Sequence, residues 1–179
     1  KIHAIGSKLS PFFAIAKGVG VNKIDKNKYN SVMKIDALNG CMFLVPKIIY
    51  EKVGWFDNDY FLYYDDHEIM FKALKRGYNS YYCPTAIAYH DTPTGTKEKY
   101  GNKIWLYYST RSSILFLLKN FNFFSLSFFC YFLSHNLKFI WGLIFIIYHS
   151  NKNCLINNLF SYFLGYYHGI KKKGGYYKL

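Results

Sequence analysis

The sequence predicts an α/β region followed by an all-α hydrophobic extension. Short apolar segments alternate with helix-like patterns between residues 33 and 90, which is typical of α/β chains. A hydrophobic segment then runs from Phe123 to Tyr148, and no acidic residue follows Glu98. With 179 residues, of which 51% are apolar, the chain is long enough for one domain and an appendage. We therefore expect a first domain over residues 1–121 and a hydrophobic, basic helical extension over residues 122–179.

The expected elements of the first domain alternate between short strands and helices. Apolar runs bounded by glycine, proline or asparagine indicate strands, while a helical spacing of apolar residues indicates helices. An acidic start and a basic end followed by Gly77 predict one helix over residues 66–76. On this basis we expect strands at Met33–Leu38, Met42–Val45, Tyr81–Tyr82 and Ala86–Tyr89, and helices at Lys47–Val53, Asp66–Arg76 and Ile104–Phe121.

The acidic segment that ends at Glu68 has the most informative chemistry, because Asp65, Asp66 and Glu68 lie directly behind a run of aromatic residues. Like charges this close resist joint ionisation, so at least one carboxylate is expected to have a raised pKa and to serve as a general base. Acids at a helix start are also ordinary, since they complement the helix dipole. Asp65 followed by Glu68 fits a capping box, and Gly77 fits a C-cap. The local sequence leaves both interpretations open.

The acidic segment belongs to a longer ordered pattern. This pattern comprises Asn39-Gly40-Cys41-Met42-Phe43-Leu44-Val45, Val53-Gly54-Trp55-Phe56-Asp57, Phe61 to Glu68, Arg76-Gly77-Tyr78, Pro84 and His90. The order resembles the C-terminal half of the catalytic domain of family 2 glycosyltransferases, particularly the rhamnosyltransferase-like members that build bacterial and archaeal surface polysaccharides. The resemblance covers about residues 35–120. It implies a partial GT-A fold, the acceptor half, that lacks the N-terminal nucleotide-binding half.

The resemblance implies roles for several residues on the acceptor side. Asp66 matches the aspartate of the family's E-D pair, which removes a proton from the acceptor hydroxyl as the catalytic base. Asp65 stands where the family usually has Glu and is expected to contact the acceptor. Gly40, Trp55 and Asp57 are also expected there, since an indole packs on a sugar ring and a carboxylate accepts its hydroxyls. For the last two residues the alternative is a helix end followed by a core aromatic pair.

Two further residues match positions on the family's donor side. His90 ends an apolar run, as does the family histidine that looks like a ligand of the divalent ion on the donor diphosphate, and imidazole suits Mn²⁺. Without the resemblance, such a histidine is an ordinary surface residue. Arg111 matches the family's arginine and is expected to contact phosphate. Asp57-Asn58-Asp59 reads as a metal-binding D-x-D, but it lies in the V-G-x-F-D segment, so we do not assign it that role.

The implied activity is that of an inverting hexosyltransferase in cell-wall or surface-polysaccharide synthesis. Its donor is a nucleotide sugar, its acceptor a lipid-linked glycan or polysaccharide, and its cofactor a divalent cation, Mg²⁺ or Mn²⁺. Nothing ahead of residue 35 looks like a nucleotide-binding unit and the chain opens on Lys1, so we expect a fragment that shares the cation with residues outside it. The alternative is a non-catalytic membrane-docking module in which the carboxylates only cap a helix.

Charge is unevenly divided along the chain. Residues 1–98 carry a net charge of +3, whereas residues 99–179 carry +10 and no acidic residue, which suits an anionic surface. Nucleic acid is not expected, because base recognition favours Arg and the chain has 2 Arg against 21 Lys. The four widely spaced cysteines agree with a reducing compartment. We therefore expect an anionic membrane surface as a partner, at the cytoplasmic face of the cell membrane.

The apolar segment 123–148 is long enough to cross a bilayer, which needs about 20 apolar residues. Polar residues, including His135 and Lys138, lie in its middle, where a charged side chain is costly. We expect two shorter helices that are broken near residues 134–136 and lie in the membrane interface, while spanning and burial against another part of the protein stay open. Residues 171–175 are expected to form a flexible basic tail.

Overall fold

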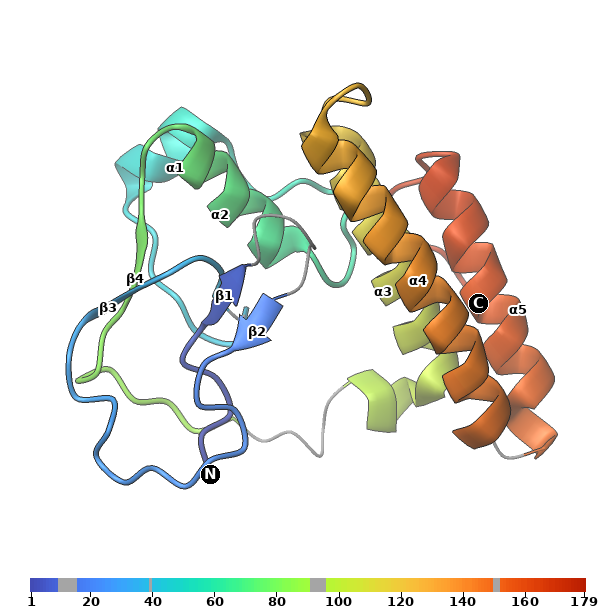
Figure 1. Cartoon of the computed structure of the whole chain (residues 1–179), viewed down its shortest axis with the longest axis horizontal. Coiled ribbons are helices and arrows are strands. Elements are labelled where there is room, and N and C mark those ends of the chain that lie inside the picture. Colours follow the sequence, from blue (N-terminus) through green and yellow to red (C-terminus); the bar gives the residue numbers. More distant parts are fainter. Residues whose placement is uncertain (10–15, 39, 91–95, 150–151) are drawn as a thin grey trace. The chain divides into compact units, whose positions relative to one another are not determined.

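The computed structural model describes residues 1–9, 16–38, 40–90, 96–149 and 152–179, and it divides them into two compact units (Figure 1). The first unit contains most of residues 1–57 together with residues 65–90, and the second contains residues 58–64 and the part from residue 96 onward. These units divide the chain elsewhere than the domain boundary expected after residue 121. The helix that precedes that boundary packs with the helices that follow it.

Two small antiparallel sheets belong to the first unit. Strand β1 (Ser7–Leu9) pairs with β2 (Ala16–Gly18), and β3 (Met33–Ile35) pairs with β4 (Ser80–Tyr82). The register of the second pair sets Met33 opposite Tyr82 and Ile35 opposite Ser80. The sequence predicted β3 and β4 but gave no sign of β1 and β2. The GT-A fold stays a prediction.

Two further strands were predicted wrongly, at residues 42–45 and 86–89. Within the described part of the chain, the only other strand pairing is a single bridge between Ser7 and Ala37. Apolar side chains in the two segments face solvent, and Leu44 and Tyr89 are 93% and 99% exposed. An apolar run becomes a strand only where a neighbouring strand can pair with its backbone, and the described residues offer these two segments none.

Two helices complete the first unit. Helix α1 (Lys47–Val53) follows Pro46 and ends at Gly54, and helix α2 (Asp65–Lys75) ends before Gly77. Both glycines have a left-handed φ, 91° and 83°, which favours glycine after a helix end. The helices pack on each other through a buried apolar cluster, Val53, Ile69 and Met70, extended by Leu38, Ile49, Tyr50, Ala73 and Tyr78. Both helices agree with the sequence prediction.

Three long helices form most of the second unit: α3 (Thr96–Asn120), α4 (Leu126–His149) and α5 (Lys152–Ile170) (Figure 1). Helices α3 and α5 approach closely because α5 carries glycine where they meet. A Cβ atom added to Gly165 would lie 2.5 Å from the carbonyl oxygen of Tyr107. A Cβ atom added to Gly169 would lie 2.8 Å from the side chain of Ile114. Two glycines spaced four residues apart permit such backbone contact between helices.

The predicted break near residues 134–136 is wrong, since α4 is continuous from Leu126 to His149. The polar side chains that suggested the break find partners without ending the helix. Ser134 Oγ donates to the carbonyl of Tyr131, and Asn136 donates to the carbonyl of Phe132. Tyr166 of α5 donates its hydroxyl to Asn136 Oδ1 at 3.1 Å. The polar residues are therefore compatible with an intact helix.

The predicted flexible tail is also wrong, because the chain beyond α5 is tied to α3. The amide of Gly175 donates to the carbonyl of Asp59 at 3.0 Å. Tyr108 and Tyr177 are joined twice: the Tyr108 hydroxyl donates to the Tyr177 carbonyl at 2.9 Å and accepts from the Tyr177 amide at 2.8 Å. Hydrogen bonds thus hold residues 175–177 against Asp59 and Tyr108 within the second unit.

Candidate active site

The acidic segment lies at the first turn of α2, where Asp65, Asp66 and Glu68 all fall. The two residues before the helix, Tyr63 and Tyr64, have left-handed φ angles of 64° and 69°. Aromatic residues seldom adopt this conformation, which costs about 1–3 kcal/mol and is often found at functional sites. The helix therefore begins directly after two residues in a strained backbone conformation.

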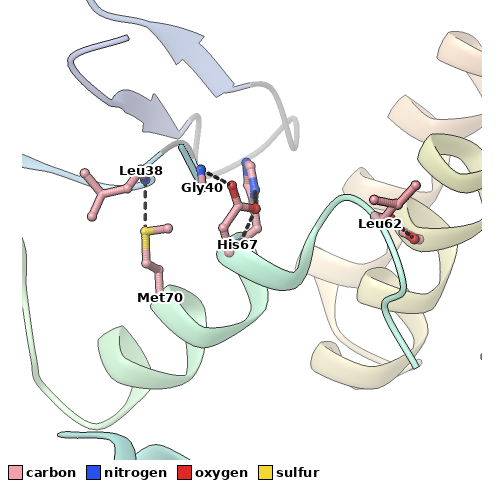
Figure 2. A network of polar contacts seen from close by, with 7 residues as sticks. Leu38, Gly40, Leu62, His67 and Met70 are labelled. Atoms are coloured by element: carbon pink, nitrogen blue, oxygen red, sulfur yellow. Dashed lines mark hydrogen bonds and ion pairs between the residues drawn. The ribbon is translucent and has the colours of Figure 1, made fainter. Parts of the chain in front are cut away.

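Asp66 is held by groups from two different segments. Its Oδ2 atom accepts a hydrogen bond from the amide of Gly40 at 2.7 Å. Its Oδ1 atom accepts from both the amide and the ring Nδ1 of His67, at 2.7 and 2.6 Å. Figure 2 shows Gly40 and His67 at this contact, with the loop after β3 lying against the start of α2. The carboxylate is thus fixed by more than the capping groups of its own helix.

The loop after β3 is bound to α2 at two points. Besides the Gly40 contact, the amide of Leu38 donates to the sulfur of Met70 at 2.9 Å (Figure 2). A Cβ atom added to Gly40 would lie 3.2 Å from Oδ2 of Asp66, which is tighter than ordinary contact. Glycine therefore suits position 40, because its amide can approach the carboxylate without a side chain in the way. The sequence placed both residues in one motif but did not predict the bond between them.

The pKa values of Asp65 and Asp66 are shifted in opposite directions. Burial raises the pKa of Asp65, and the negative charge of Asp66 raises it further. Burial also raises the pKa of Asp66, but the hydrogen bond and charge of His67, with the amides of His67 and Gly40, lower it more. The net pKa of Asp66 is therefore below its ordinary value. The raised pKa expected from the crowded acids falls on Asp65, and Asp66 is ionised at neutral pH.

The third carboxylate, that of Glu68, is buried and has a partner on its own helix. It forms an ion pair with Lys72, one turn further along α2, at 3.1 Å. This is the i, i+4 geometry that stabilises helices. Glu68 therefore supports the helix that carries Asp66.

Trp55 lies just beyond α1 and presents an indole face to solvent. The ring is 65% exposed and stacks on Tyr50, with ring centroids 4.6 Å apart and the planes 7° from parallel. The ring centroids of Phe56 and Tyr50 are 6.1 Å apart, so the three aromatic side chains pack together. Asp57, which follows, is partly buried. An exposed indole with a rigid backing can stack on a sugar ring, although the helix end at Gly54 is present as well.

His90 is exposed and lies beside a second histidine that the sequence did not single out. The rings of His3 and His90 have centroids 4.9 Å apart. Among the described residues no group of three or more metal-ligating side chains occurs. The pair offers two imidazole donors and therefore only part of a metal coordination shell. The role of His90 as a cation ligand stays a prediction.

Arg111 is fully buried in the second unit, where it binds backbone groups. Its guanidinium donates to the carbonyls of Gly175 and Asp59, at 2.6 and 3.0 Å. The side chain also lies over the rings of Tyr107 and Tyr108. The phosphate contact of Arg111 stays a prediction, while these bonds give the residue a structural task in holding the C-terminal segment.

Asp59, the last residue of the D-x-D sequence at residues 57–59, has partners within the second unit. The carboxylate of Asp59 forms an ion pair with Lys119 at 2.5 Å, and its backbone carbonyl accepts hydrogen bonds from Arg111 and Gly175. These contacts connect Asp59 to α3 and to the C-terminal segment.

Comparisons with known proteins give a distant relative. The chain is 20% identical over 84 residues to the low-salt glycan biosynthesis hexosyltransferase Agl10 of Haloferax volcanii. The aligned region covers 47% of this chain and 27% of that relative, so the chain spans about a quarter of the relative's length. No protein-family model matches, and no solved structure matches. The similarity supports a distant relationship to a glycosyltransferase, without specifying its family or fold.

Proposed function

We propose that this chain is the acceptor-binding part of an inverting glycosyltransferase of family 2, and that Asp66 is its catalytic base. The observation that carries the proposal is the arrangement of the Asp66 carboxylate between Gly40 and His67. The distant similarity to a hexosyltransferase of glycan biosynthesis supports the same class of reaction. A nucleotide sugar as donor and a lipid-linked or polysaccharide glycan as acceptor belong to the proposal.

The hydrogen bonds of Asp66 favour one of its two oxygens as the proton acceptor. A carboxylate offers about four acceptor positions, two on each oxygen. Among the described residues, Oδ1 accepts two hydrogen bonds, both from His67, whereas Oδ2 accepts one, from Gly40. The side chain is 15% exposed. An acceptor hydroxyl can therefore donate to the remaining position on Oδ2 while the other bonds keep the carboxylate in place.

The proposed step is a single displacement. The acceptor hydroxyl donates to Asp66 Oδ2, and its oxygen attacks the anomeric carbon from the face opposite the nucleotide. The new glycosidic bond forms as the bond to the nucleoside diphosphate breaks, and the hydroxyl proton passes to Asp66. The lowered pKa keeps Asp66 deprotonated before the reaction, as a general base must be, and it also makes Asp66 a weaker base than an ordinary aspartate. Trp55 would pack on the acceptor sugar, with Asp65 and Asp57 near its hydroxyls.

The proposed cofactor is a divalent cation, Mg²⁺ or Mn²⁺, near the donor diphosphate. When bound, such a cation stabilises the charge that develops on the leaving phosphate oxygens. His90, together with the adjacent His3, would supply imidazole donors to it. Because these two residues provide only part of a coordination shell, the remaining donors would come from the substrate and from other carboxylates.

The second unit is proposed to associate with the cytoplasmic face of the membrane. Among the described residues, α4 is long and apolar enough to cross a bilayer. Its exposed residues include Ser127 and Lys138, but most are apolar and are spread along its whole length: Leu126, Phe129, Phe132, Leu133, Leu137, Ile140, Trp141, Ile144, Phe145, Ile147 and Tyr148. Helix α5 exposes a similar stripe, Ile156, Phe160, Phe163, Tyr167 and Ile170. Besides apolar residues such as Phe128 and Ile146, these helices bury Ser134, Asn158, Ser161 and His168. Apolar residues outside and polar residues inside are typical of lipid-facing helices.

The catalytic assignment is tested by exchanging Asp66 for Asn in the full-length protein encoded by the gene. Transfer is measured from a panel of labelled nucleotide hexoses into membrane glycolipid. Asp66→Asn removes the proton acceptor, so we expect transfer to fall by about 10² to 10⁴. Glu51→Gln, which alters an exposed helix carboxylate paired with Lys47, is the matched control and should stay within about twofold. Transfer by Asp66→Asn at the wild-type rate would contradict the proposal.

The alternative is a non-catalytic membrane-docking module, which the apolar outer faces of α4 and α5 favour. In that case the acidic residues only stabilise α2, and Asp66→Asn changes the free energy of unfolding without affecting any transfer. Both functions predict vesicle binding. The transfer assay separates them, because a docking module gives no labelled product with any nucleotide hexose.

A further inference from the structure

A groove of about 520 Å³ lies among α3, α4 and α5 in the second unit. Its walls are largely aromatic, with Trp105 from α3, Phe139, Trp141 and Phe145 from α4, and Tyr162 and Tyr166 from α5. This volume falls within the range of about 300–1,000 Å³ that is typical of sites for small ligands. Asp66 is not among the residues that line the groove.

One part of the groove is polar and basic. Lys138 and His135 of α4 line it, together with the hydroxyl residues Ser109, Thr110 and Ser113 of α3. His135 is fixed by a contact of 3.1 Å between its Nε2 atom and the carbonyl of Ser113. None of the lining residues is acidic, and the sequence has no Asp or Glu after residue 98. The basic part of the groove therefore favours an anion.

The groove continues into the apolar outer surface of α4. Trp141 and Phe145 line the groove, and the same two side chains are 70% and 50% exposed on the surface that we propose to face lipid. A ligand whose charged group contacts Lys138 could therefore extend an apolar chain over these rings into the bilayer. A soluble anion would leave this aromatic part of the groove uncovered. The combination fits an amphiphile with an anionic headgroup.

We propose that this groove binds an anionic membrane lipid, with its phosphate at Lys138 and the hydroxyl residues of α3 and its hydrocarbon chain over Trp141 and Phe145. The Lys138 ammonium donates a charge-assisted hydrogen bond to a phosphate oxygen, and bonds of this kind are stronger than neutral ones. The hydrocarbon chain also packs on the aromatic side chains of the groove. The site goes beyond general attraction to an anionic surface and does not depend on the transferase chemistry.

The experiment measures binding of dioleoyl phosphatidic acid to the chain in phosphatidylcholine nanodiscs. Brominated acyl chains quench tryptophan, so quenching reports contact with Trp105 and Trp141. We expect phosphatidic acid with brominated chains to quench more strongly than brominated phosphatidylcholine. Lys138→Gln should weaken phosphatidic acid binding by about tenfold or more, because it removes a hydrogen bond between charged groups. Lys138→Arg keeps the charge and should bind within a fewfold of wild type.

Matched controls separate the groove from its surroundings. Lys171→Gln removes a lysine from the exposed basic stretch after α5 and should change binding by less than about twofold. Far-ultraviolet circular dichroism checks that each variant keeps its helices. Equal losses with Lys138→Gln and Lys171→Gln would show attraction to the charged surface alone and overturn the proposal. Equal quenching by the two brominated lipids, or full displacement by inorganic phosphate at about the lipid concentration, would overturn it as well.

Discussion

The contact between His67 and Asp66 makes a prediction about proton affinity. His67→Phe keeps an aromatic ring at position 67 but removes the Nδ1 donor that lies 2.6 Å from Asp66 Oδ1. The amides of His67 and Gly40 stay in place, so the carboxylate keeps its backbone hydrogen bonds. Burial raises the pKa of Asp66, and the variant lacks the His67 side chain that lowers it. The pKa of Asp66 should therefore rise.

The size of the rise follows from the lost hydrogen bond. A hydrogen bond to a charged group contributes about 1.5–3 kcal/mol. The His67 side chain is 32% exposed, which favours the lower end of that range. Loss of the bond should therefore weaken the preference for the ionised form of Asp66 by about 1.5 kcal/mol and raise its pKa. The charge of His67 also lowers the pKa of Asp65, but it is the smallest of the causes that act on that group, so the Asp65 titration should change less.

The assay is a carbon-13 NMR titration of the aspartate side-chain carboxyls of the chain in detergent micelles. His3→Phe, which replaces an imidazole that packs on His90 by a phenyl ring, is the matched control and should leave the pKa of Asp66 unchanged. Acid unfolding gives an independent measurement. Asp66 has a lowered pKa in the folded state, so its ionised form stabilises the fold above the ordinary value near 3.8, and this contribution is lost as pH falls through the folded-state pKa. His67→Phe should therefore unfold at higher pH. An unchanged or lowered pKa for Asp66 would refute the reasoning.

Two further predictions concern the second unit. Arg111→Met removes two hydrogen bonds to the carbonyls of Gly175 and Asp59. Trypsin should therefore cleave the lysines after α5 at least about tenfold faster than in wild type. Lys34→Gln, a change in the first unit, is the control and should leave that rate unchanged. An equal cleavage rate for Arg111→Met and wild type would contradict the role given to the arginine. Gly165→Val places side-chain atoms against the backbone of Tyr107. It should reduce the free energy of unfolding of the helices in micelles by about 1–3 kcal/mol. Asn157→Ala, on the exposed side of α5, should change this free energy by less than about 0.5 kcal/mol. Equal unfolding midpoints for the two variants would show that α3 and α5 do not approach this closely.

Local signals made the helices of the first unit predictable. Pro46 and Gly54 bracket α1, and the acids at the start of α2 with Gly77 at its end give both limits of that helix. Each signal acts within a few residues of the feature that it predicts, so the sequence alone carries it. The same locality explains why Asp66 could be singled out, since its acidic neighbours are adjacent in the chain.

Contacts between distant residues could not be predicted in this way. The bond between Gly40 and Asp66 joins residues 26 apart, and the bonds from Tyr108 to Tyr177 join residues 69 apart. The contact of His67 with Asp66 is local, but it depends on the direction of two side chains, which a pattern of residue types does not specify. The break wrongly predicted in α4 has a similar origin, because Asn136 is paired with Tyr166 on another helix.

The central claim is that the Asp66 carboxylate accepts the proton of the acceptor hydroxyl, and chemical rescue tests it most directly. Asp66→Ala in the full-length protein leaves space where the carboxylate was, so added formate can replace the missing base. We expect sugar transfer to fall by about 10² to 10⁴ and then to rise with formate concentration, but not with chloride at the same ionic strength. Transfer by Asp66→Ala at the wild-type rate without formate would contradict the account.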